Sequence, residues 1–246
     1  MRRTEIVETR FQNVEVWKSA TATEFRVAGA IHAAYHSRRY LTGLAWDLIA
    51  AGALLRPAGP PQSILMLGLA GGTSCRVLRH LLPTCQITAI DIDGQLVDLA
   101  HRHMNLDALG IEIITTDAYP WLAMNRRTFD VVFDDIYLAG KTDVFRSREW
   151  NPELLGHLRR AVAPDGILGI NLVTGSGHRN MQTHTRRIVQ HAFPSIRSLR
   201  TPETMNEVLI AGAKVATRAR LDDYASAFSD WRDRSYWDLI EVRKLT

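Results

Sequence analysis

A glycine-rich loop followed by an aspartate is the part of this chain best suited to chemistry. Gly68, Ala70 and Gly72 come directly after an apolar run, and Asp91 ends the next apolar run about 20 residues later. Small residues let the backbone pass close to a ligand, and a helix beginning near Thr73 would direct free N–H groups toward it. A carboxylate at this spacing can bind both ribose hydroxyls. The pattern therefore predicts a nucleoside site.

Aspartates follow two later apolar runs in the same way. Asp117 comes after residues 111–115, and Asp134 and Asp135 end residues 129–135. The carboxyl ends of parallel strands meet at one edge of a sheet, where open α/β sheets place their chemistry. Because two adjacent carboxylates usually point in different directions, we expect one of the pair to act there, and we favour Asp135.

Apolar strands alternate with helical segments through the middle of the chain. The spacing predicts strands at 63–68, 86–92, 111–115, 129–135 and 166–172, and helices at 72–82, 94–109, 150–163 and 178–191. Such strands indicate a parallel sheet with helices on both faces. Two further runs, 195–200 and 206–213, are too close together for a crossover helix and should pair antiparallel at one edge. The prediction is an α/β, Rossmann-like class I methyltransferase fold with a mostly parallel seven-stranded sheet.

The two ends of the chain should add smaller elements. Residues 9–32 alternate in the manner of strands and predict a small N-terminal β-hairpin. A helical pattern over 38–55 ends in a linker rich in proline and glycine, so residues 1–60 are expected to precede a nucleoside-binding domain over 61–246. The last 30 residues have the pattern of an amphipathic helix and a tail that pack on the core.

Composition and charge narrow the function classes. The chain has 246 residues, of which 46% are hydrophobic and 23% charged, as is typical of soluble globular proteins. The net charge is +4, but the basic residues are scattered as short pairs, so a nucleic-acid partner is not expected. Two cysteines make no disulfide framework, no signal peptide is recognisable, and the longest apolar run, 41–55, is too short to span a membrane. We therefore predict a cytoplasmic protein that does not insert into membranes.

Several segments together resemble the spermidine synthase (polyamine aminopropyltransferase) family and its relatives that use S-adenosylmethionine. Residues 9–16 are similar to the family's opening strand, 27–32 to its Asp-Gly-x-x-Gln turn, and 67–73 to its Gly-Gly-Gly-Asp-Gly-Gly loop. Further similar segments are 90–93 (Glu-x-Asp), 116–118 (Gly-Asp-Ala/Gly), 129–135 (Tyr-Asp-Val-Ile-x-x-Asp) and 158–167 (Leu-x-x-Leu-x-Pro-Gly-Gly). The resemblance implies a donor of the S-adenosylmethionine type, a small-molecule acceptor and a homodimer; the exposed edge of the N-terminal hairpin also needs cover.

The resemblance assigns a donor-binding role to a set of residues: His32, Gly68, Leu69, Ala70, Gly71, Gly72, Asp91, Ile92, Asp117, Ala118 and Asp134. Asp91 would bind the ribose hydroxyls, unless it is only the N-cap of the following helix. Asp117 would accept a hydrogen bond from the adenine amino group and Ala118 would donate its N–H to the ring, unless Asp117 only forms a turn.

Two residues are predicted to be catalytic. Asp135 could accept a proton from an attacking amine or hold that amine in line with the sulfonium carbon. Tyr137 could line the acceptor side, or be a packing residue. Alkyl transfer from a sulfonium needs little covalent help, and His101 and His103 diverge on their helix, so no metal site is predicted.

The chain departs from the family at residues that recognise amines. Ala70 replaces the loop aspartate that faces the aminopropyl ammonium, and Leu138 and Ser37 replace two acceptor-side acids; His32 also replaces a glutamine. Alanine at position 70 leaves room for the complete amino acid of S-adenosylmethionine. The leading hypothesis is therefore transfer of a methyl or aminocarboxypropyl group from S-adenosylmethionine to a small molecule. The alternatives are a polyamine aminopropyltransferase that uses decarboxylated S-adenosylmethionine and a nucleoside-binding protein without catalysis.

Overall fold

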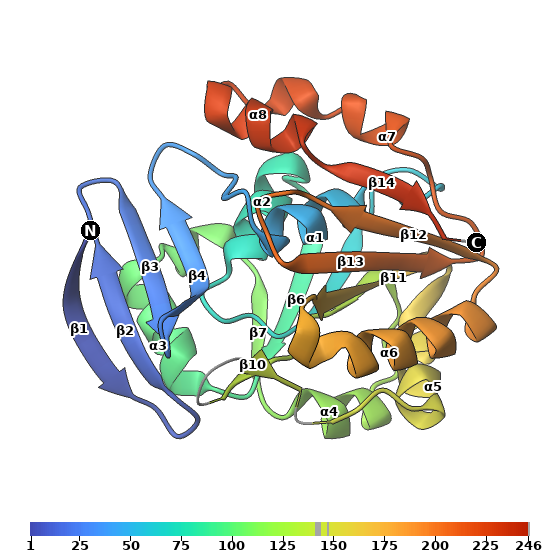
Figure 1. The fold of residues 1–246 in the computed structure, drawn as a ribbon, viewed down its shortest axis with the longest axis horizontal. Helices are drawn as coiled ribbons and strands as arrows, with labels where there is room; N and C mark the ends of the chain where they lie inside the picture. The colour runs from blue at the N-terminus through green and yellow to red at the C-terminus, as the bar shows by residue number, and fades with distance from the viewer. Residues whose placement is uncertain (141–143, 147, 246) are drawn as a thin grey trace.

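A mostly parallel sheet forms the centre of the molecule (Figure 1). The structure is a computed structural model that describes residues 1–140, 144–146 and 148–245. Its main sheet has the order β14-β12-β13-β11-β8-β5-β6-β7. The parallel strands are β5 (Ser63–Leu67), β6 (Gln86–Asp91), β7 (Glu112–Thr115), β8 (Phe129–Asp134) and β11 (Val162–Val173). The predicted class I methyltransferase-like α/β fold is confirmed.

The antiparallel edge of the sheet is one strand wider than predicted. Strands β12 (Ser195–Arg200) and β13 (Asn206–Gly212) form the expected antiparallel pair, and β13 joins them to β11. An additional strand, β14 (Glu241–Lys244), pairs antiparallel with β12, so the sheet has eight strands and not seven. The sequence of β14 has one apolar residue, Val242, among charged ones, and this is too little alternation to reveal an edge strand.

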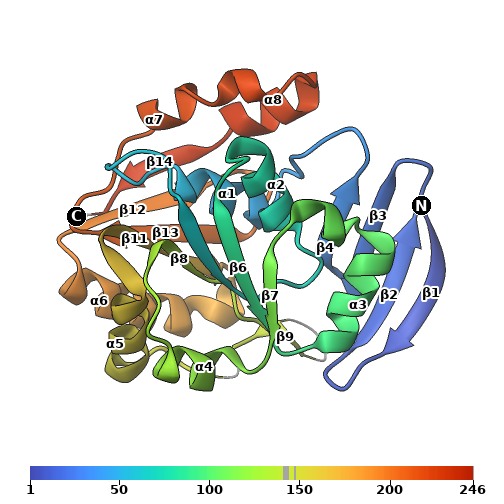
Figure 2. The ribbon, with the colours of Figure 1, turned by 180° about the vertical axis from the view of Figure 1, so that it is seen from behind.

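Helices cover both faces of the sheet, as Figures 1 and 2 show from opposite sides. Alternate side chains of β5 enter two separate hydrophobic cores. In the first core Ile64 and Met66 pack with residues of α1 (Ala45–Ala53), α2 (Thr73–Leu81) and α3 (Gly94–His103). In the second core Leu65 and Leu67 pack with residues of α4 (Ala118–Met124), α5 (Pro152–Ala161) and α6 (Arg179–Ala192). The fold is therefore a helix–sheet–helix sandwich.

An N-terminal antiparallel sheet packs at the end of the sandwich near α3 (Figure 1). Its four strands are β1 (Arg2–Glu8), β2 (Asn13–Lys18), β3 (Ala22–Val27) and β4 (Ala30–His36), twice the number in the predicted hairpin. Val14, Val16 and Phe25 are fully buried and belong to the first core. The Thr73 hydroxyl, at the start of α2, also bonds to the backbone of Ala34. These contacts hold the N-terminal sheet against the glycine loop.

The helix after this sheet is shorter than its apolar pattern. Helix α1 begins at Ala45 and not near residue 38, because the buried Asp47 carboxylate accepts hydrogen bonds from the N–H groups of Thr42 and Gly43 and fixes a loop there. The predicted helix over 94–109 is divided at Asn105, which has the left-handed φ of 54°, into α3 and a short 3-10 turn (Leu106–Leu109).

The C-terminal segment folds as several short elements in place of one amphipathic helix. They are α7 (Ala219–Asp222), a 3-10 turn (Ala225–Ala227) and α8 (Trp231–Asp238), which lead into β14. Trp237 is fully buried and its indole N–H donates to the Leu221 carbonyl, so the segment packs on the first core as expected. The remaining small elements are β9 (Leu138–Ala139), β10 (Val144–Phe145) and a 3-10 turn (Ser176–His178). Among the helices of the described residues, none has the length and apolar character needed to cross a bilayer.

Candidate functional site

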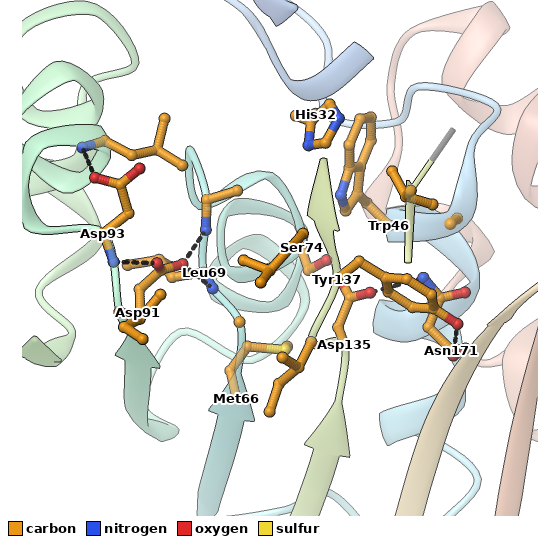
Figure 3. A pocket seen from close by; sticks show the side chains of 18 of the residues that line it. His32, Trp46, Met66, Leu69, Ser74, Asp91, Asp93, Asp135, Tyr137 and Asn171 are labelled. Atoms are coloured by element: carbon orange, nitrogen blue, oxygen red, sulfur yellow. Dashed lines mark hydrogen bonds between the residues drawn. The ribbon is translucent and has the colours of Figure 1, made fainter. Parts of the chain in front are cut away.

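A cavity of about 620 Å³ lies at the carboxyl ends of β5, β6, β8 and β11. This size is ordinary for a small-molecule site. Most of the predicted site residues line it: His32, Gly68, Leu69, Ala70, Asp91, Ile92, Asp117, Ala118, Asp135 and Tyr137. Figure 3 shows Asp91 and Asp93 on one side of the cavity and Asp135, Tyr137 and Asn171 on the other. Gly71, Gly72 and Asp134 were also predicted to bind a ligand and do not line it.

The glycine loop has the backbone shape that its sequence predicts. Gly68 has a φ of +90°, and a Cβ there would lie 2.4 Å from the carbonyl oxygen of Asp135, so only glycine fits. Ala70 also has a positive φ, 48°, which is unusual for a residue with a side chain. Gly71 lets the loop approach the N-terminal sheet, because a Cβ there would lie 2.5 Å from Cβ of Ala33. Gly72 is the N-cap of α2. Gly71 and Gly72 therefore shape the loop but do not line the cavity.

Asp91 is fixed by the loop that it faces. Its Oδ2 accepts hydrogen bonds from the N–H groups of Leu69 at 2.9 Å and Ala70 at 2.8 Å, and its Oδ1 accepts from the N–H of Asp93. Burial raises the pKa of Asp91, and these donors oppose that effect. The N-cap of α3 is Asp93, so the alternative that Asp91 caps this helix does not apply. Asp91 still lines the cavity, with its carboxylate held in one orientation.

Asp93 connects the site to the N-terminal sheet, a role that sequence reasoning missed. Its Oδ2 accepts from the Thr9 hydroxyl at 2.7 Å and from Nε2 of Gln12 at 3.3 Å. Phe11 and Gln12 consequently line the cavity. One indication of this role was present in the sequence: residues 9–16, which include Thr9 and Gln12, are similar to the family's opening strand. That similarity assigned no role to an individual side chain.

Asp117 is both a helix cap and a cavity residue. Its Oδ1 accepts a hydrogen bond from the N–H of Tyr119 at 3.0 Å and so caps α4, while Asp117 and Ala118 both line the cavity. Asp117 therefore does form a turn, as the alternative prediction stated. This role still leaves its other carboxylate oxygen for ligand binding.

The adjacent carboxylates Asp134 and Asp135 point to different sides of the sheet. Asp134 is 1% exposed, forms an ion pair with Arg146 and accepts a hydrogen bond from the Trp150 indole at 2.8 Å. Asp135 lines the cavity, and Nδ2 of Asn171 donates to its Oδ1 at 2.7 Å. The structure therefore gives Asp134 a place in the protein interior, apart from the predicted nucleoside site.

Burial raises the pKa of Asp135 to about 7. The hydrogen bond from Asn171 and the charge of Arg146 oppose this rise, and the Asp134 carboxylate adds to it. A carboxyl group with a pKa near neutrality can accept and release a proton under ordinary conditions, which is what a general base requires.

Tyr137 and His32 also line the cavity, and Figure 3 shows Tyr137 near Asp135 and His32 near Trp46. The Tyr137 hydroxyl donates to the Asn171 carbonyl at 2.9 Å and accepts from the N–H of Val173 at 3.2 Å, so it is bound to β11. Burial raises the pKa of Tyr137 and lowers that of His32, which keeps both side chains neutral near pH 7. Trp46 and Asn171 were not predicted; the only sign of Asn171 was one polar residue inside an apolar strand.

The charges around the cavity favour a cationic ligand. Four carboxyl groups line it, those of Asp91, Asp93, Asp117 and Asp135, against the single guanidinium of Arg148 among the described residues. Within that same part of the chain, no cluster of His, Cys, Asp or Glu side chains has the arrangement of a metal site. The glycine loop, the fixed carboxylate of Asp91 and the buried carboxyl group of Asp135 therefore face one cavity.

Curated relatives carry two kinds of names. The chain is 28% identical over 174 residues to a "Probable polyamine aminopropyl transferase" of Bifidobacterium longum, covering 70% of this chain and 38% of the relative. It is 32% identical over 148 residues to a polyamine aminopropyltransferase of Neisseria meningitidis, covering 59% and 54%. The chain is spermidine synthase-like. It is also 24% identical over 156 residues to an eEF1A lysine and N-terminal methyltransferase homolog of Drosophila melanogaster, covering 60% and 23%.

Solved structures show the same fold. A probable spermidine synthase from Corynebacterium glutamicum superimposes with a TM-score of 0.76 at 14% identity, covering 99% of this spermidine synthase-like chain and 91% of that chain. Human methyltransferase-like protein 13 in complex with SAH gives 0.56 at 18% identity, covering 78% and 91%. The chain spans about a quarter to about half of the length of the curated relatives described above. A search of protein-family models finds no match.

Proposed function

We propose that the chain is a transferase that moves an aminopropyl group from decarboxylated S-adenosylmethionine to the nitrogen of a small amine. Asp135 carries the proposal, because it is a buried carboxyl with a pKa of about 7 that faces the cavity. The names of the relatives agree with this class of chemistry, since aminopropyl transfer and lysine or N-terminal methylation all alkylate an amine. The proposal replaces our leading sequence-based hypothesis, which placed intact S-adenosylmethionine first.

The cavity residues fit such a donor. The loop backbone at Gly68 leaves no room for a side chain, and Asp91 is held beside it by two loop N–H groups. We assign the ribose hydroxyls to Asp91 and the adenine to Asp117 and Ala118, which line the cavity at the ends of neighbouring strands. The acidic lining favours the positive charge of a sulfonium.

Asp135 has the main task in the mechanism. When the amine nitrogen forms its bond to the sulfonium-bound carbon, the carbon–sulfur bond breaks and its electron pair leaves with the neutral thioether. The nitrogen must then lose a proton, and the carboxylate of Asp135 receives it. Because the leaving group is good, the remaining task of the protein is to hold nitrogen, carbon and sulfur in line and away from water.

Ala70 favours a second candidate function. Ala70 lines the cavity with only a methyl group, where the family has an aspartate that faces the aminopropyl ammonium. Intact S-adenosylmethionine carries a carboxylate that such an aspartate would repel, whereas alanine does not. A methyl or aminocarboxypropyl transferase that uses the intact donor is therefore the alternative.

Calorimetric titration and product analysis test the proposal. The ligand-free protein is titrated with decarboxylated S-adenosylmethionine, S-adenosylmethionine and methylthioadenosine, and then incubated with each donor and a panel of small amines. We expect the decarboxylated donor to bind and to be converted to methylthioadenosine in an amine-dependent reaction. Adenosylhomocysteine as product would establish methyl transfer. Failure of all three nucleosides to bind would refute a nucleoside-dependent enzyme altogether.

Two further expectations from the sequence stay proposals. We propose a homodimer in which the outer strand β1 is covered, because Ile6 on this edge strand is 56% exposed. We also propose a cytoplasmic location. Light scattering of the purified chain measures the first, and fractionation of the producing cells measures the second.

A further inference from the structure

A chain of side-chain hydrogen bonds leads from the start of β13 to the carboxyl group of Asp135. The Thr204 hydroxyl donates to Oδ1 of Asn206 at 2.8 Å, and Nδ2 of Asn206 donates to Oδ1 of Asn171 at 3.0 Å. Nδ2 of Asn171 then donates to Oδ1 of Asp135 at 2.7 Å. All four residues line the cavity. This series of hydrogen bonds thus links two neighbouring strands, β13 and β11, and ends at Asp135, the proposed base.

These bonds determine which way the Asn171 amide faces. The ionised carboxylate of Asp135 can only accept, so the NH₂ group of Asn171 points to it and the carbonyl oxygen of Asn171 accepts from Asn206. Asn171 is 5% exposed, and its backbone is paired in β11 with Val208 of β13. Its backbone carbonyl also accepts from the Tyr137 hydroxyl. Asn171 is therefore held on a rigid element by its side chain and its backbone.

We propose that Asn171, held by Asn206, is a positioning residue that binds Oδ1 of Asp135 and leaves Oδ2 to take the proton of the acceptor amine. Within the described residues no other side chain bonds to the Asp135 carboxyl. The kinetic consequence rests on the proposed function, whereas the orientation and titration of Asp135 do not. Asn171 would fix the direction from which the amine approaches.

The charged and titratable surroundings of Asp135 make its proton affinity sensitive to Asn171. Asp134 precedes it on the chain, Arg146 follows β10, Asp91 comes from β6, and the buried thiol of Cys75 comes from α2. The two aspartates favour the protonated form of Asp135, and Arg146 favours the ionised form. The N–H of Asn171 stabilises the ionised form from a short distance, so its loss should make Asp135 bind its proton more tightly.

Two variants separate the positioning role from general damage. Asn171→Leu removes the amide and keeps the number and branching of the side-chain heavy atoms, and Asn206→Leu removes only the group that holds it. In the ligand-free protein the Asp135 carboxyl is titrated by carbon-13 NMR, with Asp135→Asn to assign its signal. We expect the titration midpoint to rise by about one pH unit in Asn171→Leu, which corresponds to about a tenfold change in proton affinity, and by less in Asn206→Leu.

Kinetics give the second measurement. In Asn171→Leu the rise of kcat/KM with pH should move up by the same amount. At pH 7 the ionised fraction of Asp135, and with it kcat, should fall about fivefold, while the donor Kd measured by calorimetry stays within about twofold. A folded Asn171→Leu protein with an unchanged Asp135 titration overturns the proposal. If Asn171→Leu does not fold, Asn206→Leu decides, and an unchanged midpoint there overturns it. A shifted midpoint in a protein that transfers nothing to any amine refutes the proposed function and leaves the positioning of Asp135 intact.

Discussion

Replacing Ala70 with aspartate should change which donor the protein prefers. Ala70 lines the cavity, and its N–H lies 2.8 Å from Oδ2 of Asp91, so a carboxylate at position 70 would lie on the donor side. The backbone accepts the change, because aspartate and asparagine tolerate the left-handed φ of 48° better than alanine does. Ala70→Asp should favour the donor that lacks a carboxylate and disfavour the one that carries it.

The size of this change follows from Coulomb's law. Two unit charges about 6 Å apart at an effective dielectric constant of about 20 interact with about 3 kcal/mol. The cavity is open to water, so we reduce this to about 1.5 kcal/mol, which is about a tenfold change in affinity. The nearby Asp91 carboxylate will raise the pKa of the new acid, and the comparison should therefore be made at pH 8, which favours ionisation of the new acid.

The assay is calorimetric titration with decarboxylated and intact S-adenosylmethionine, and the measured quantity is the ratio of the two Kd values. Ala70→Asn is the matched control, because it has the same shape and backbone preference without the charge. We expect the ratio to move about tenfold toward the decarboxylated donor in Ala70→Asp, and to stay near its original value in Ala70→Asn. Equal ratios in the two variants would refute the electrostatic reasoning about position 70.

Four further outcomes follow from the geometry. Asp135→Asn should lower kcat by a factor of about 100 or more and leave the donor Kd within about twofold, as measured by steady-state kinetics and calorimetry. Since burial raises the pKa of Asp135 to about 7 and the carboxylate is the active form, kcat/KM should be lost as the pH falls through about 7. Gly68→Ala should weaken donor binding at least about tenfold and lower Tm, because its Cβ would meet the Asp135 carbonyl, whereas Gly59→Ala, at a similar positive φ in open space, should bind normally. Burial raises the pKa of Asp47 to about 7 as well, so the folded state binds protons more tightly than the unfolded state does. The free energy of unfolding, measured in urea, should therefore be larger at pH 5.5 than at pH 8. This difference between the two pH values should be smaller in Asp47→Asn.

The sequence was sufficient for the parallel strands and the shape of the glycine loop because both depend on local patterns. Short, largely apolar runs between helical segments are typical of buried parallel strands. Glycines directly after such a run predict a tight turn, and the structure shows one at Gly68, where a Cβ would not fit. The edge of the sheet depends on pairing and not on local pattern. Glu241, Arg243 and Lys244 are exposed, so nothing in the sequence of β14 distinguishes a strand from a tail.

The rest of the cavity lining was less predictable, because its residues come together only in the folded chain. Asn171, Asn206 and Trp46 come from two strands and a helix that are far apart in the sequence. None of them stands in a recognisable motif. Long-range hydrogen bonds of this kind have no spacing rule, whereas the glycine loop and Asp91 are joined by a single strand–helix–strand unit.

The alternation of side chains along β8 explains why Asp134 and Asp135 have different surroundings. Val131 and Phe133 belong to the first core, which lies on the side of α1 and α2, and Val132 belongs to the second. Alternation then sends Asp134 toward the second core, where Arg146 and Trp150 bind it, and Asp135 toward the glycine loop. The two acids are therefore not interchangeable. Loss of Asp134 would leave the buried Arg146 without its counter-ion and so reduce stability, whereas loss of Asp135 would remove the proposed base and leave that ion pair intact.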